Sequence, residues 1–161
     1  MTSGRNWPFW VLVGGLVVGH FLLHLAIGLG ATAPDLLTPA VLLAARRTRG
    51  SVAAGIGLGL GLLQDSLSLD AFGADAVTLT ILAYLGSRSR DLFVGDSAVF
   101  LLVYLFLGKW LHDVIIYLLS GMPGQDESLI WLLVFAPLAA VYAALAGVTA
   151  MAAYRSVSGE R

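Results

Sequence analysis

The sequence predicts an all-α fold, a polytopic transmembrane bundle of six helices that forms a single membrane domain. Of its 161 residues, 58% are hydrophobic and only 12% are charged, and the mean hydropathy is +0.88. Soluble domains carry about 25% charged residues. The apolar residues also fall in several long blocks, whereas one membrane anchor needs a single block of roughly 20 residues. A third observation, the layout of the basic residues, orders these blocks across a membrane.

Six apolar blocks supply the helices. A hydrocarbon core of about 30 Å takes roughly 20 apolar residues in α-helical form. The blocks at 34–45 and 72–86 are short for that span, so loop residues must extend them or neighbouring helices must bury them. Pro137 is expected to bend the last helix. The predicted helices cover residues 7–29, 34–45, 51–67, 72–86, 97–119 and 128–154.

The basic residues collect in alternate loops. Short cytoplasmic loops of membrane proteins are enriched in Lys and Arg. Six helices with a cytoplasmic N-terminus place eight of the nine Lys and Arg residues on that side, and the opposite loops carry Asp70, Asp126 and Glu127 instead. We therefore predict that both termini are cytoplasmic. The eight residues are Arg5, Arg46, Arg47, Arg49, Arg88, Arg90, Arg155 and Arg161.

Glycines alternate along the third block, at Gly55, Gly57, Gly59 and Gly61. A lone strand cannot satisfy its backbone in lipid, whereas a helix can. In a helix the same residues form two overlapping GxxxG pairs, and small residues of this kind let helices approach closely. The sequence therefore predicts that these glycines are sites of helix packing or of contact with a partner's helix.

Five ionisable residues fall within or beside the predicted helices: Asp35, Asp65, Lys109, His112 and Asp113. Charged groups inside a membrane usually face the bundle interior and have partners. Lys109 and Asp113 are four residues apart on one helix, so the two can neutralise each other. The alternative is that one of them, with His112, pairs with another helix or with a segment of a partner, and a proton relay is a third reading.

Metal and catalytic sites have weaker support. His20 and His24 have the i, i+4 spacing of a ligand pair but lack an identified third ligand, and Asp65, Asp70 and Asp75 match no dedicated cation loop. The chain contains no cysteine, which excludes disulfides and thiolate sites. It also lacks a phosphate-binding loop, a G-x-S-x-G elbow and an H-E-x-x-H motif. We expect no enzyme activity, no metal and no cofactor.

Several short motifs resemble those of the rod shape-determining MreD family. The resemblance covers residues 34–90 by motif and the whole chain by length and helix pattern. The motifs are PDLL at 34–37 leading to the arginines at 46–47, GLLQDSLS at 61–68, Gly73, and YLGSR at 84–88.

This resemblance implies a non-enzymatic scaffold in the bacterial inner membrane. Such a scaffold would bind the single-span protein MreC within the elongation machinery for lateral peptidoglycan synthesis, which also contains the RodA glycosyltransferase and a penicillin-binding transpeptidase. It also implies a fold similar to the substrate-binding subunit of energy-coupling-factor vitamin transporters, so a vitamin or small-solute transporter subunit is the alternative. The lipid bilayer is the expected surrounding medium, and no nucleic-acid partner is expected.

Overall fold

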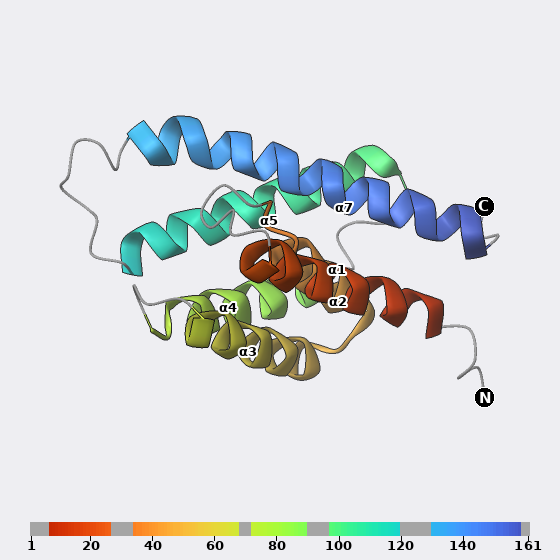
Figure 1. Cartoon of the computed structure of the whole chain (residues 1–161), viewed down its shortest axis with the longest axis horizontal. Helices are drawn as coiled ribbons and strands as arrows, with labels where there is room; N and C mark the ends of the chain where they lie inside the picture. The colour runs from red at the N-terminus through yellow and green to blue at the C-terminus, as the bar shows by residue number, and fades with distance from the viewer. Residues whose placement is uncertain (1–6, 27–33, 68–71, 90–96, 120–129, 159–161) are drawn as a thin grey trace.

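The computed structural model describes residues 7–26, 34–67, 72–89, 97–119 and 130–158, and these residues form six helices and no strand (Figure 1). The sixth helix includes a π-helical turn, η3, directly before α7. The all-α prediction is therefore confirmed for the described residues. The elements are α1 (Trp7–Ala26), α2 (Leu37–Arg47), α3 (Gly50–Leu67), α4 (Ala74–Arg88), α5 (Ala98–Leu119), η3 (Trp131–Phe135) and α7 (Ala136–Ser158).

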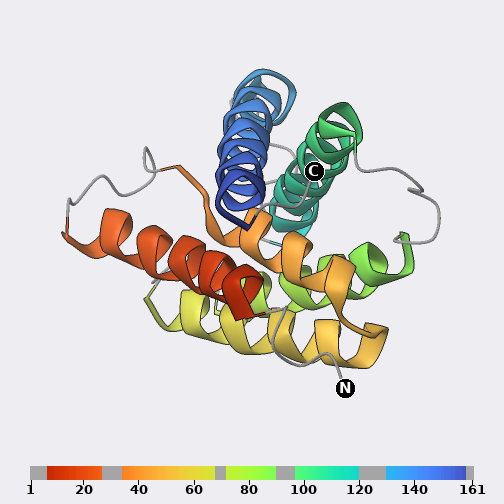
Figure 2. The same cartoon turned by 90° about the vertical axis from the view of Figure 1, so that its right-hand side faces the viewer.

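The helices lie in three layers (Figure 2). α5 and α7 pack side by side in one outer layer, α3 and α4 pack side by side in the other, and α1 and α2 lie between them. Three helices are long and apolar enough to cross a membrane: Trp7–His24 within α1, α5, and Leu132–Ser158. The other three are shorter or less apolar, so they depend on their neighbours.

α2 is the centre of the bundle. It has 11 residues, which rise about 16 Å at 1.5 Å per residue, too little to cross a hydrocarbon core of about 30 Å. Every residue from Leu37 to Ala45 is buried, and α2 contacts α1, α3, α4, α5 and α7. Of the two expected ways to accommodate this short helix, the structure therefore shows burial among neighbouring helices.

The predicted start of this helix at residue 34 is wrong, because Asp35 caps it. The backbone N–H groups of Leu37 and Thr38 donate to Oδ1 of Asp35 at 2.9 and 3.0 Å, and the Thr38 hydroxyl donates to Oδ2 at 2.6 Å. Such bonds satisfy the first N–H groups of a helix, which have no partner inside it. α4 likewise begins at Ala74 rather than 72, after Gly73, whose φ of +96° suits glycine.

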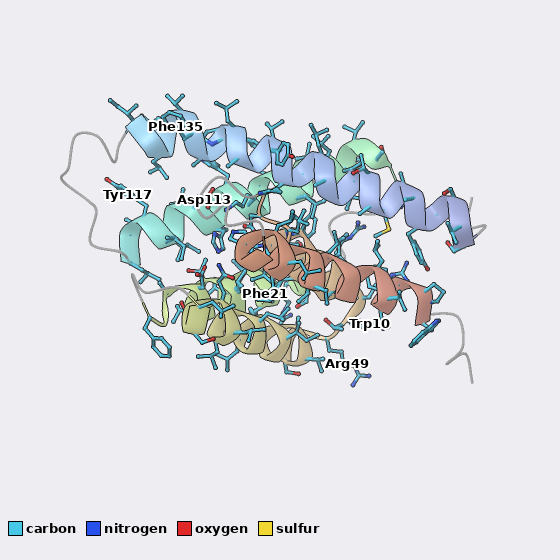
Figure 3. All side chains as sticks on the ribbon, in the orientation of Figure 1. Trp10, Phe21, Arg49, Asp113, Tyr117 and Phe135 are labelled. Atoms are coloured by element: carbon cyan, nitrogen blue, oxygen red, sulfur yellow. The ribbon has the colours of Figure 1, made fainter. Side chains whose placement is uncertain are left out.

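The arginines gather at one end of the bundle. α1 begins and α7 ends on the same side (Figure 1), and Figure 3 shows Arg49 and Trp10 on that side, with Tyr117 and Phe135 toward the opposite side. We call this the arginine end, defined by Arg46, Arg47, Arg49, Arg88 and Arg155. The other residues of the charge prediction lie outside the described residues: Arg5, Arg90 and Arg161, and the acidic Asp70, Asp126 and Glu127.

The bend expected at Pro137 stays a prediction, and the feature found just before this residue is a π turn of residues 131–135. Proline lacks an N–H, and in a regular helix its ring collides with the carbonyl four residues earlier. A π turn widens the helix there by one residue. We attribute the π turn to this clash.

The two glycine pairs of α3 lie on different faces. A Cβ atom at Gly57 would collide with the backbone carbonyl of Leu79 on α4, and one at Gly61 would collide with the backbone of Ala76. A Cβ at Gly55 or Gly59 would meet nothing within 4 Å. Residues two apart on a helix do not share a face, so α3 has one inner pair, Gly57 and Gly61, and one outer pair, Gly55 and Gly59.

We therefore expect Gly57→Leu or Gly61→Leu to separate α3 from α4. Overpacking a tight contact costs about 1–3 kcal/mol or more, so the apparent unfolding midpoint in detergent should fall. Gly59→Leu is the matched control, because its side chain enters open space and gains about 1 kcal/mol of helix propensity over glycine. Equal midpoints for Gly57→Leu and Gly59→Leu would contradict the assignment of the inner pair.

Candidate functional site

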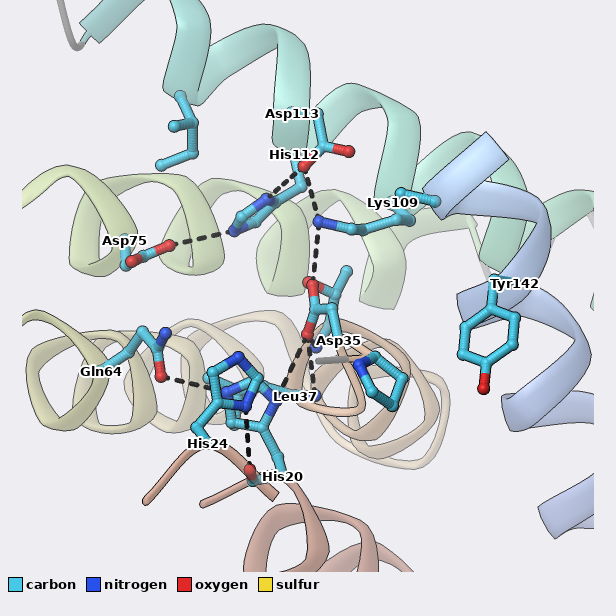
Figure 4. Close-up of a pocket in the computed structure, with 14 residues that line it drawn as sticks. His20, His24, Asp35, Leu37, Gln64, Asp75, Lys109, His112, Asp113 and Tyr142 are labelled. Carbon is cyan, nitrogen blue, oxygen red and sulfur yellow. Dashed lines mark hydrogen bonds and ion pairs between the residues drawn. The ribbon is translucent and has the colours of Figure 1, made fainter. Parts of the chain in front are cut away.

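A polar cavity of about 540 Å³ lies in the half of the bundle away from the arginine end. All six helices or the turns before them contribute to it (Figure 4). Its lining combines charged and polar side chains with a few apolar ones. The lining residues are His20, His24, Pro34, Asp35, Leu37, Thr38, Gln64, Asp75, Lys109, His112, Asp113, Ile116, Ala139 and Tyr142.

Lys109 of α5 is at the centre of the charged groups. Its Nζ lies 2.6 Å from Oδ1 of Asp113 on the same helix and 3.0 Å from Oδ2 of Asp35 before α2 (Figure 4). The pair predicted from the i, i+4 spacing is therefore present. Asp35 adds a second carboxylate, so that the ammonium joins α5 to the start of α2.

His112 extends this network to α4. Its Nε2 lies 3.1 Å from Oδ1 of Asp75, and its Nδ1 lies 3.2 Å from Oδ1 of Asp113. Both ring nitrogens face carboxylate oxygens, so a doubly protonated ring can donate to both. The contact of the alternative prediction, in which His112 helps to pair this charged cluster with another helix, is also present, because His112 contacts Asp75 of α4.

The network compensates for the burial of its charges. Lys109 is 8% exposed and Asp113 is 5% exposed. Ions removed from water lose several kcal/mol of solvation unless partners and hydrogen bonds replace it. Here each ion has an oppositely charged or hydrogen-bonding neighbour, although Oδ2 of Asp113 is buried with no hydrogen-bond partner among the described residues.

The histidines of α1 lie beside this network, with Nδ1 of His20 3.7 Å from Oδ1 of Asp35. The backbone N–H of Leu36 donates to Nδ1 of His20 at 3.3 Å, so Nε2 carries the proton and donates to Oε1 of Gln64 at 3.1 Å. His24 donates from Nδ1 to the His20 carbonyl at 3.0 Å. Both ring nitrogens of His20 are thus engaged, and within the described ranges no three His, Asp or Glu side chains are grouped as a metal site requires.

Asp65 lies outside the cavity and caps α4. It is 1% exposed and accepts hydrogen bonds from the backbone N–H groups of Asp75 and Ala76 at 3.1 and 2.9 Å. The carboxylate of Asp75 instead faces His112. Asp65 and Asp75 therefore have separate partners, and Asp70, the third acid considered with them, lies outside the described residues.

A family model for the rod shape-determining protein MreD matches residues 5–154. The chain belongs to the MreD family. Neither a curated protein nor a solved structure gave a match. MreD proteins are a shape-determining membrane family and not a known enzyme family, so this chain has a role in rod shape determination.

In this MreD chain, sequence reasoning missed the partners that join different helices. Asp35 and Lys109, Asp75 and His112, and His20 and Gln64 each meet across long stretches of sequence, and helical periodicity relates only residues of one helix. One signal was available: every ion buried in a membrane needs a partner. That rule requires such pairs but does not choose among them.

The MreD cavity favours some ligands over others. Asp35, Asp75 and Asp113 supply three carboxylates against the ammonium of Lys109 and, where it is doubly protonated, the ring of His112. An anion would face this excess of negative charge, whereas a cation or a neutral hydrogen-bond donor would not. Most of these groups already bond to one another. Their main structural effect is to hold α1, α2, α4 and α5 together.

Replacing Lys109 by Met should strongly destabilise the protein, because Asp35 and Asp113 would then lie buried without their cation. Breaking one side of a buried ion pair costs about 3–5 kcal/mol. Arg49→Gln removes one charge from an exposed position and should change stability by about 0.5 kcal/mol or less. The check is denaturant unfolding of both variants in detergent micelles. Similar losses for the two variants would show that the network does not stabilise the fold.

Proposed function

We propose that this MreD-family chain is a non-enzymatic scaffold of the cell-elongation machinery that binds MreC. Through MreC it would position the RodA glycosyltransferase and the penicillin-binding transpeptidase that build lateral peptidoglycan. Its place would be the bacterial inner membrane, with the arginine end in the cytoplasm because short basic loops stay on that side. Both termini would then be cytoplasmic, and the polar cavity would lie in the outer half of the membrane.

The main observation in support of this proposal is the uncovered outer face of α3. α3 packs mainly on α4 and, less extensively, on α2, which leaves its opposite side uncovered. Gly55 and Gly59 have open space on that side, and Val52, Leu62 and Leu63 around them are exposed. Small residues allow two helix backbones to approach closely in lipid. A single-span partner such as MreC offers one helix that could pack there.

The cavity gives the second candidate function, a vitamin or small-solute transporter subunit with a fold akin to that of energy-coupling-factor transporters. Its volume of about 540 Å³ lies within the range of about 300–1,000 Å³ common for ligand sites. A solute would need to compete with the ion pairs of Lys109 and His112, and an anionic solute would be disfavoured. We rank this function second for that reason.

The test is affinity purification of the tagged protein in mild detergent, with mass spectrometry of bound proteins and small molecules. Gly55→Leu combined with Gly59→Leu should lower MreC recovery about tenfold, equivalent to 1.4 kcal/mol, which is within the cost of overpacking. The matched control is Gly14→Leu combined with Gly15→Leu on α1, where a Cβ also meets nothing within 4 Å. MreC recovery should stay unchanged in this control.

Three results would contradict the scaffold proposal. Equal MreC recovery for the α3 variant and the wild type would exclude the outer face of α3 as the binding site. An equal loss of MreC from the α1 control and the α3 variant would make the effect nonspecific. Recovery of a bound vitamin with an ATPase module and no MreC would favour the transporter subunit.

A further inference from the structure

A second, apolar groove of about 170 Å³ runs between α4 and α5. Leu42 of α2 contributes to its lining, together with Leu85 of α4 and Leu107 and Leu111 of α5. Leu85, Leu107 and Leu111 are also exposed on the outer surface of the helices. The groove shares no lining residue with the polar cavity, so it is a separate feature that faces the surrounding lipid.

A cation lies beside this groove, toward the arginine end. Tyr104 lines the groove, and its hydroxyl donates to the Leu42 carbonyl at 3.1 Å, which fixes the ring. The guanidinium carbon of Arg46 lies 5.7 Å from the centroid of that ring. Within the described residues Arg46 has no carboxylate partner within 4 Å, although a guanidinium carries five N–H donors.

We propose that this groove binds an anionic phospholipid, with one acyl chain in the groove and the phosphate held by Arg46. The groove is apolar, as a chain requires, and it passes from Tyr104 toward the middle of α5. Guanidinium groups bind phosphate through paired hydrogen bonds, and basic sites between transmembrane helices bind lipid headgroups. This inference goes beyond the scaffold function and does not depend on MreC.

The neighbouring arginines differ from Arg46 in their surroundings. Arg47 lies 4.0 Å from the centroid of the Phe9 ring and 5.8 Å from that of Tyr154, between α1 and α7. Arg49 is exposed in the turn after α2. Neither lies over a residue that lines the groove. Removing the charge of Arg49 therefore changes the net charge as much as removing that of Arg46 but leaves the proposed site intact.

The experiment is native mass spectrometry of the full chain in detergent, titrated with phosphatidylglycerol or phosphatidylcholine. The wild type should retain phosphatidylglycerol more strongly, because no carboxylate among the described residues near Arg46 would pair with choline. Arg46→Gln should lower the affinity for phosphatidylglycerol about tenfold, as expected for one lost charged hydrogen-bonding group. Arg49→Gln should lower it about twofold or less, as expected for an exposed charge.

Groove-filling variants test the acyl-chain half of the site without changing charge. Leu107→Trp would occupy the groove and should weaken phosphatidylglycerol binding as much as Arg46→Gln does. Leu118→Trp is the matched control, because Leu118 is exposed on the same helix but does not line the groove. If Arg46→Gln does not fold, Arg46→Lys keeps the charge, loses the paired donors and should give an intermediate affinity.

Four results would overturn the proposal. Equal retention of the two lipids would indicate ordinary annular lipid, and equal losses for Arg46→Gln and Arg49→Gln would indicate net charge alone. Full displacement of the lipid by millimolar inorganic phosphate would indicate that Arg46 binds free phosphate rather than a lipid headgroup. A dimer that Leu107→Trp abolishes would assign the groove to a second copy of the chain.

Discussion

The burial of one ammonium group between two carboxylates organises this bundle. Lys109 lies on α5, and its charge is stable in the interior because Asp35 and Asp113 both lie within 3.0 Å. Asp35 also caps α2, the short central helix that cannot cross a membrane by itself. A single carboxylate therefore both starts α2 and fixes its position against α5, and the other helices pack around that pair.

One face of α3 packs inside the bundle, and the opposite face is uncovered. Gly57 and Gly61 pack against the α4 backbone, whereas a Cβ at Gly55 or Gly59 would meet nothing within 4 Å. Asp65 strengthens the inner contact because it caps α4 from α3. The polar network and the inner glycines together stabilise the unit. The outer α3 face and the α4–α5 groove remain uncovered, and we propose that they bind the partner and lipid.

The sequence predicted what depends on composition and on spacing within one helix. The six helices, the Lys109–Asp113 pair and the close approach at Gly57 and Gly61 all follow from periodicity and from the cost of polar groups in lipid. Contacts between helices do not follow, because a periodicity says nothing about which helices are neighbours. Asp75 was therefore not identified as the partner of His112, and the outer glycines could not be separated from the inner ones.

The most direct test of partner binding at the outer face of α3 is photo-crosslinking in cells from two matched positions. A photoreactive residue at Leu62 lies on the outer face of α3, and one at Leu138 lies on an exposed part of α7. If the outer face of α3 binds MreC, position 62 should give an adduct with MreC and position 138 should give none. An adduct from Leu138 alone, or equal adducts from both positions, would contradict the claim that the outer face of α3 binds the partner.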